Sequence, residues 1–209
     1  MTDFSKLSLD RFLAELASDA PTPGGGTAAA VAGALGAALA EMVAALTLSK
    51  EKFAEAHEAM RSIAASARRA REEFLTLARE DAEAYDAVVA ARRLPKETEE
   101  QTAARKAAIE SANRRATEVP MRTARLAASV LALLPDLAEK GNPNALSDAG
   151  AAAVLLESAV EGALLNVGIN LSGASDSEFI GRMQRETTTL QVDSQRLRSQ
   201  IVAVVRKKF

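Results

Sequence analysis

Residues 21–48 read "PTPGGGTAAAVAGALGAALAEMVAALTL" and contain one charged residue, Glu41. Two prolines fix φ on the approach, and the three glycines have no Cβ, so the backbone can turn sharply or come close to another group. The alanine-rich run from about Thr27 predicts a helix buried on nearly all sides. Free N–H groups at its start favour an anion or a polar oxygen, although a tight turn explains the glycines equally well. The glycines are Gly24, Gly25 and Gly26.

The composition predicts one all-α domain. Hydrophobic residues make up 48% of the 209 residues, which suffices for a core, while aromatic residues make up 3% and Trp is absent. Small aliphatic side chains must therefore pack closely spaced helices. No segment alternates like a β-strand, and no hairpin signal occurs. We expect residues 1–209 to form a single domain of long, mostly antiparallel helices, and the length of its apolar seams indicates a homodimer.

Composition also excludes several kinds of function. The net charge of −2 gives no basic footprint for nucleic acid, and the absence of cysteine excludes thiolate chemistry. A single histidine, His57, excludes a multi-histidine metal site within one chain, so we expect no metal. The N-terminus lacks a signal-peptide pattern, so we expect a cytoplasmic protein. Residues 27–48 are long enough to span a bilayer, but they are mostly Ala and Gly, so we favour a core helix over a membrane protein.

A long helix from near Lys50 to near Arg92 is predicted by apolar residues at heptad spacing. Asp81 occupies a position of this seam where an apolar residue is expected. A buried carboxylate is costly without a partner or a task, and burial raises its pKa, which suits a general acid or base. A salt bridge inside the bundle is the structural alternative. The seam comprises Phe53, Ala56, Met60, Ile63, Ala67, Ala70, Phe74, Leu77, Ala84 and Val88.

Shorter signals delimit the other helices. In chain order they are an amphipathic stretch at 8–18, a capping-box pattern at Thr98 and Gln101, Pro120 as a kink, an apolar helix at 147–171, and Ser175 or Asp176 as the last N-cap.

Further polar residues are candidates for a site. Asn166 and Asn170 share one helix face with Gly162, where two amides could hold a polar heterocycle or could only join helices. Asp148 and Lys50 lie at expected helix ends, where they would complement the helix dipoles or take part in a site. His57 is expected to be solvated. A basic group, which is either a solvated surface or a landing site for a polyanion, comprises Arg92, Arg93, Lys96, Arg105 and Lys106.

Six motifs in order resemble the cyclodeaminase/cyclohydrolase family. This family includes the C-terminal domain of formimidoyltransferase-cyclodeaminase and bacterial methenyltetrahydrofolate cyclohydrolases. The resemblance covers nearly the whole chain, with one departure, because Ser49 stands before Lys50 where the family usually has glycine. The motifs are "PTPGGGTAAAVAGALGAALAEMV", "DAEAYDAV", "RLPKETEE", "VPMRTA", "GNPNALSD" and "NVGINL".

The resemblance implies an all-helical homodimer that takes a tetrahydrofolate derivative, with one glutamate or a polyglutamate tail, as substrate and binds no permanent cofactor. It implies that glycines 24–26 shape the folate pocket and that Asp81 transfers protons. Lys50 would keep a carboxylate ionised or bind substrate. Asp148, Asn166 and Asn170 would hold the pterin. The basic group, including Lys96 and Arg105, would attract the glutamate tail.

Two activities follow from the resemblance. We place first a cyclodeaminase, which closes 5-formiminotetrahydrofolate to 5,10-methenyltetrahydrofolate and ammonia and would depend on a separate formimidoyltransferase. The alternative is a cyclohydrolase, which opens 5,10-methenyltetrahydrofolate to 10-formyltetrahydrofolate. A non-enzymatic helical scaffold dimer also accounts for the heptads, but it leaves Asp81 and the glycines unexplained.

Overall fold

The computed structural model describes residues 6–208, and within this range it contains helices and no β-strand. This confirms the all-α expectation; Met1–Ser5 and Phe209 lie outside the described residues. The elements are α1 (Leu9–Leu16), α2 (Gly25–Leu48), η2 (Glu51–Ala56), α3 (His57–Arg92), α4 (Glu99–Leu131), α5 (Leu134–Lys140), η3 (Pro143–Ala145), α6 (Leu146–Leu171) and α7 (Ser177–Arg206).

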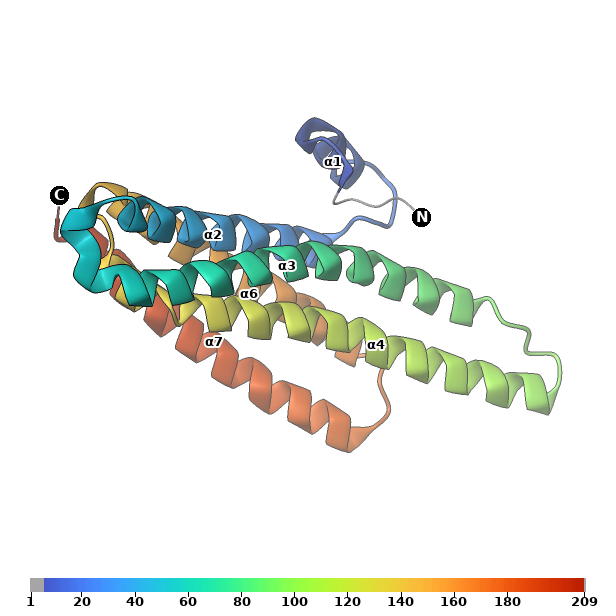
Figure 1. The fold of residues 1–209 in the computed structure, drawn as a ribbon. Coiled ribbons are helices and arrows are strands. Elements are labelled where there is room, and N and C mark those ends of the chain that lie inside the picture. Colours follow the sequence, from blue (N-terminus) through green and yellow to red (C-terminus); the bar gives the residue numbers. More distant parts are fainter. Residues whose placement is uncertain (1–5, 209) are drawn as a thin grey trace.

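Four long helices form two layers. Helices α2 and α6 lie side by side in one layer, α3 and α4 form the other, and α7 packs along α6 and α4. Successive long helices run in opposite directions, and the ends of α3 and α4 project beyond the rest of the bundle (Figure 1). Helix α1 lies apart from the bundle.

Helix α2 packs closely because its glycines leave room for large neighbours. A Cβ at Gly33 would lie 2.5 Å from Phe74 Cε1, and one at Gly36 would lie 2.7 Å from Leu156 Cγ. One face of α2 is nevertheless open, because Leu35 is 54% exposed, so the expectation of burial on nearly all sides is wrong for that face.

The long helix expected from Lys50 begins later. Residues Glu51–Ala56 form a 3₁₀ helix, and Phe53 adopts non-helical angles (φ −110°, ψ 21°), so α3 starts at His57. Ser49 ends α2 with φ −73°, which any residue adopts, so the turn does not need the family's usual glycine.

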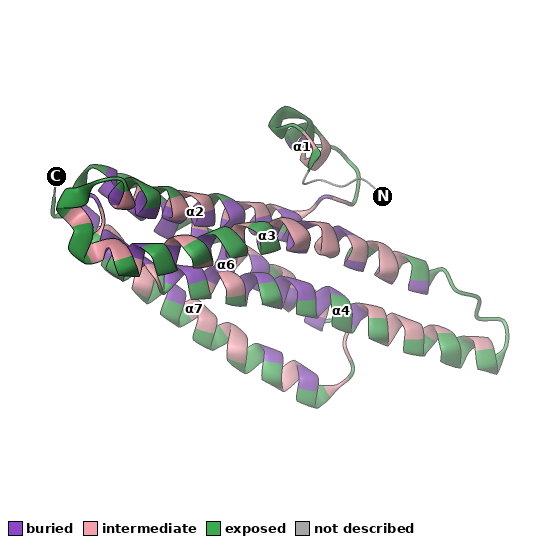
Figure 2. Cartoon of the chain, in the orientation of Figure 1, coloured by how far each residue is buried: buried purple, intermediate pink, exposed green. Residues whose placement is uncertain are grey.

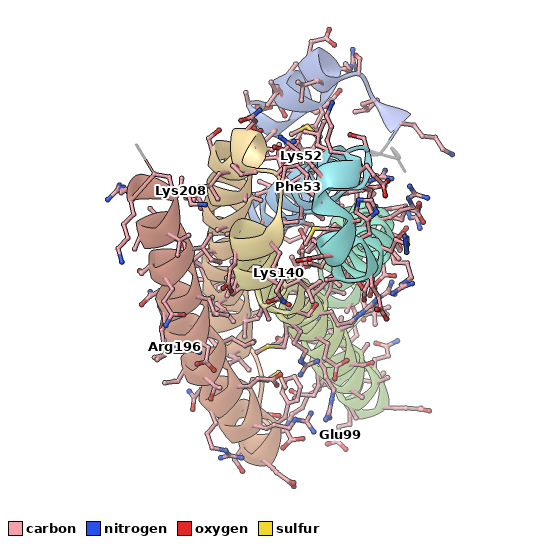
Figure 3. All side chains as sticks on the ribbon, turned by 60° about the vertical axis from the view of Figure 1, so that its left-hand side comes forward. Lys52, Phe53, Glu99, Lys140, Arg196 and Lys208 are labelled. Carbon is pink, nitrogen blue, oxygen red and sulfur yellow. The ribbon has the colours of Figure 1, made fainter. Side chains whose placement is uncertain are left out.

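From Met60 onward the heptad prediction is confirmed. Its apolar residues through Val88 are buried against α2 and α4, and Figure 2 shows this buried stripe facing the bundle interior. The predicted capping box of Thr98 and Gln101 is also present. Asp176 caps α7 by accepting from the N–H groups of Glu178 and Phe179.

Candidate active site

A cavity of about 420 Å³ lies at one end of the two layers. It opens between the start of α2, the C-terminal half of α3, the middle of α4 and the end of α6. Four polar side chains from three helices converge there, which is typical of a ligand site. The lining includes Gly24, Gly25, Gly26, Asp81, Tyr85, Val88, Arg92, Asn113, Asn166, Ile169, Asn170 and Gly173.

Asp81 caps α2 from a neighbouring helix. Gly24 is the N-cap residue of α2 and has no side chain to accept from the free N–H groups of the first turn. The Asp81 carboxylate accepts from Thr27 Oγ1 at 3.0 Å and from the Thr27 backbone N–H. A Cβ at Gly26 would lie 2.7 Å from Asp81 Cγ, so only glycine lets the carboxylate reach the helix start.

Gly25 and Gly26 therefore serve close approach and not a sharp turn. No glycine among the described residues has a positive φ, and Gly25 and Gly26 already belong to the first turn of α2. A Cβ at Gly25 would lie 3.3 Å from Asn166 Nδ2, so α6 also approaches this turn. The start of α2 thus holds a carboxylate on one side and an amide on the other.

Burial raises the pKa of the Asp81 carboxyl above its ordinary value, and the two hydrogen bonds from Thr27 oppose this rise. A carboxyl group whose pKa lies nearer neutrality exchanges protons more readily at working pH than an exposed one.

Three asparagines line the cavity, and each is tied to a backbone carbonyl. Asn166 Nδ2 donates to Gly162 O at 2.8 Å within α6. Asn170 Nδ2 donates across to Ala116 O of α4 at 2.6 Å, and Asn113 Nδ2 of α4 donates to Gly173 O at 2.8 Å. The last two bonds join α4 to the end of α6, so these amides also stabilise the walls of the cavity.

Helix α3 contributes a second, more open wall. Asp81, Tyr85, Val88 and Arg92 follow one another at helical spacing and all line the cavity, so this wall spans about 16 Å from carboxylate to arginine. Arg92 is exposed at the rim, and its guanidinium has no ion-pair partner among the described residues. An anionic part of a ligand could bind there.

The structure separates two predicted residues from this cavity within one chain. Lys50 follows the far end of α2, about 35 Å from Gly25 at 1.5 Å per residue. Asp148 lies in the first turn of α6, about 27 Å along that helix from Asn166. His57 is beside Lys50 and contacts its carbonyl oxygen through Nε2 at 3.2 Å. The site roles of Lys50 and Asp148 stay predictions.

The basic group divides in the structure. Arg92 lines the cavity, whereas Lys96 lies in the connection between α3 and α4 and Arg105 lies near the projecting start of α4. Arg105 donates from Nε and Nη2 to Arg92 O, at 3.2 and 2.9 Å, and so caps the end of α3. Its predicted contact with substrate stays untested.

Tyr85 and Asn113 line the cavity but were not predicted as site residues from the sequence. Tyr85 is one helical turn from Asp81, and this spacing could have identified it. Asn113 is 6% exposed within the apolar stripe of α4, where a polar residue is the same kind of signal as Asp81.

Comparisons with known proteins agree on one family. Residues 8–189 match the family model described as formiminotransferase-cyclodeaminase. The methenyltetrahydrofolate cyclohydrolase of Methylorubrum extorquens is 39% identical over 96% of this chain and 97% of that protein. The formimidoyltransferase-cyclodeaminase of Rattus norvegicus is 36% identical, and the match spans 88% of this chain but 34% of the rat protein.

A solved structure has the same fold. It is the formiminotetrahydrofolate cyclodeaminase of Thermotoga maritima, with a TM-score of 0.87, 31% identity and 97% coverage of both chains. The family match over most of the chain and these full-length similarities lead to one conclusion: the chain belongs to the formiminotransferase-cyclodeaminase family.

Proposed function

We propose that this chain is an enzyme that acts on the carbon held between N5 and N10 of a tetrahydrofolate derivative, with Asp81 as the group that transfers protons. The observation that carries the proposal is the Asp81 carboxylate, held in the cavity at the start of α2 with a raised pKa. Both reactions named for its relatives pass through a tetrahedral carbon, and both need protons to move.

We now place the cyclohydrolase reaction first, in contrast to the order that the sequence alone favoured. The relative from Methylorubrum extorquens supports this order, because it is 39% identical and nearly equal in extent to this chain. In this reaction water attacks the methenyl carbon and its proton passes to the Asp81 carboxylate. The carbon–N5 bond then breaks as the added hydroxyl becomes the formyl carbonyl and releases its proton to solvent. Asp81 returns the first proton to N5, and the formyl group remains on N10.

The cyclodeaminase reaction is the second candidate, because the Thermotoga maritima structure bears that name and covers the whole bundle. Here N10 attacks the formimino carbon on N5 and gives up its proton to Asp81. The protonated carboxyl then supplies a proton to the departing nitrogen, which leaves as ammonia. A separate formimidoyltransferase would have to supply this substrate.

The rest of the cavity fits the remainder of such a substrate. The three asparagines would hold the pterin, and the wall formed by Tyr85, Val88 and Arg92 would follow the aminobenzoyl group toward the glutamate carboxylates. Neither reaction changes an oxidation state, so the proposed chemistry needs only the folate substrate and water.

We also propose that the protein is a homodimer that buries the outer face of α2 and α6. This face has exposed apolar side chains, including Leu35, Met42 and Leu46 on α2 and Val154, Leu165 and Ile169 on α6. Both helices are also long and apolar enough to cross a bilayer, although about half of each apolar window is buried within the bundle. A second copy suits the face because it is uncharged and so does not repel itself.

The decisive experiment follows the absorbance of 5,10-methenyltetrahydrofolate in both directions. Faster loss of this compound than spontaneous hydrolysis supports the cyclohydrolase, and its appearance from 5-formiminotetrahydrofolate with equal ammonia supports the cyclodeaminase. Asp81→Asn should lower kcat by about 100-fold or more. Asp86→Asn, on the same helix but outside the cavity lining, should change it less than about twofold. Equal effects of the two variants would remove the proposed role of Asp81.

A further inference from the structure

Pro120 creates the acceptor that fixes Asn170. In an α-helix each carbonyl accepts from the N–H four residues later, but Pro120 has no N–H. Ala116 O therefore lacks its usual donor inside α4, which continues through Pro120. Asn170 Nδ2 of α6 takes that place at 2.6 Å. The proline thus makes a site on α4 to which the amide of the neighbouring helix binds.

The other two asparagines are held in the same way. Asn113 Nδ2 donates to Gly173 O and Asn166 Nδ2 to Gly162 O, each at 2.8 Å. A carbonyl oxygen can only accept, so all three amides must direct their NH₂ groups toward the backbone. Each Oδ1 is left on the other side of its amide. No described residue donates a hydrogen bond to any of these three Oδ1 atoms. None of the three oxygens is among the described side-chain atoms that are fully buried without a hydrogen-bond partner.

We infer that Asn113, Asn166 and Asn170 present a fixed set of hydrogen-bond acceptors to the cavity and so select a ligand by the direction of its hydrogen bonds. Asn113 is then a specificity residue and Pro120 a positioning residue that acts through Asn170. Together with the Asp81 carboxylate, three acceptor oxygens favour a ligand edge that carries N–H donors or positive charge.

This inference rests on the proposed function, and it predicts which oxidation state of the pterin binds. The tetrahydropterin ring offers N5–H and N8–H as donors, and the methenyl and formimino derivatives carry a cationic amidine. In fully oxidised folate N5 and N8 are lone-pair acceptors, which would face the asparagine oxygens unfavourably. Outside this reduced ring the two molecules are the same, so the two compounds form a matched pair.

The experiment measures the dissociation constants of tetrahydrofolate and folate by anaerobic calorimetry. The wild-type protein should bind tetrahydrofolate about 100-fold more tightly, the expected effect of opposing two buried hydrogen bonds. Asn113→Ala should reduce this ratio about tenfold. Pro120→Ala restores an N–H that competes for Ala116 O, so it should reduce the ratio severalfold while the melting temperature holds or rises. Asn142→Ala, a buried asparagine at the other end of the bundle, should leave the ratio unchanged.

A ratio close to one in the wild-type protein would overturn the inference while leaving the folate function standing, because both ligands would still bind. Failure of both ligands to bind would overturn both proposals. A purely structural role for Asn113 and Pro120 would weaken the two ligands equally and leave the ratio at its wild-type value. That outcome would also overturn the assignment of these residues.

Discussion

Replacing Gly26 with alanine tests whether close approach is the reason for glycine at this position. The new Cβ would lie 2.7 Å from Asp81 Cγ, whereas ordinary contacts begin at 3.4 Å. The carboxylate must therefore retreat by at least about 0.7 Å from Thr27, because the helix backbone cannot yield. A catalytic group displaced by about 1 Å loses about 100-fold in rate, so we expect kcat/KM to fall by that order.

The neighbouring glycines provide matched controls for this substitution. A Cβ at Gly24 would meet only Pro21 O at 3.8 Å, and one at Gly25 would lie 3.3 Å from Asn166 Nδ2. We therefore expect Gly24→Ala to remain within about twofold of the wild type. Gly25→Ala should lose a few fold, since an amide can shift by tenths of an ångström.

The assay is initial-rate kinetics on the methenyl chromophore, together with thermal unfolding of each variant. Alanine is favoured over glycine inside a helix by about 1 kcal/mol, so Gly26→Ala should not be grossly unstable. A Gly26→Ala enzyme with wild-type kcat/KM would refute the reasoning. Equal losses at all three positions would refute it too, because only Gly26 faces Asp81.

Three other perturbations follow from the geometry. Because burial raises the pKa of Asp81, its ionised form destabilises the folded state at neutral pH. Urea unfolding should therefore find the Asp81→Asn variant more stable than the wild type at neutral pH. This difference in the free energy of unfolding should shrink as the pH falls toward 3.8, where the wild-type carboxyl becomes protonated in both states. Light scattering should find that Leu165→Glu, on the α2/α6 face, yields monomers, whereas Val192→Glu on α7 leaves dimers. Arg92→Met should raise KM about tenfold with kcat unchanged, an effect that a substrate without glutamate should abolish and that Arg93→Met should not reproduce.

The site residues that could be predicted from the sequence are polar residues at positions where the helical pattern calls for apolar ones. Asp81 was visible because it interrupts an otherwise apolar heptad seam, and the structure places it in the cavity. Asn166 and Asn170 were visible as polar residues in an apolar helix, and both also line the cavity. Each is conspicuous because a buried polar group needs a reason.

Other positions could not be found from the sequence, because their meaning depends on distant segments. The glycines suggested a turn, whereas the reason for Gly26 is a carboxylate 55 residues later in the chain. The 3₁₀ segment Glu51–Ala56 interrupts a seam whose spacing is regular, so heptads alone placed the start of α3 too early. Lys50 follows the helix that begins in "PTPGGG", and Asp148 starts the helix that ends in "NVGINL", so the length of each helix places these residues at the other end of the bundle.

Pro120 shows why residues that are unfavourable inside a helix gather at one end of the molecule. A proline inside a helix costs about 3 kcal/mol, and a glycine at Gly26 costs about 1 kcal/mol relative to alanine. Pro120 leaves the carbonyl of Ala116 without its helical N–H donor, and Gly26 leaves a space where another residue would have its Cβ. The cavity uses both, since Asn170 binds the carbonyl and Asp81 fills the space. A pure scaffold would gain stability from alanine at both positions. Gly26 lines the cavity, and Pro120 acts on it through the Ala116 carbonyl and Asn170, so their joint effect favours selection for a ligand over selection for the bundle alone.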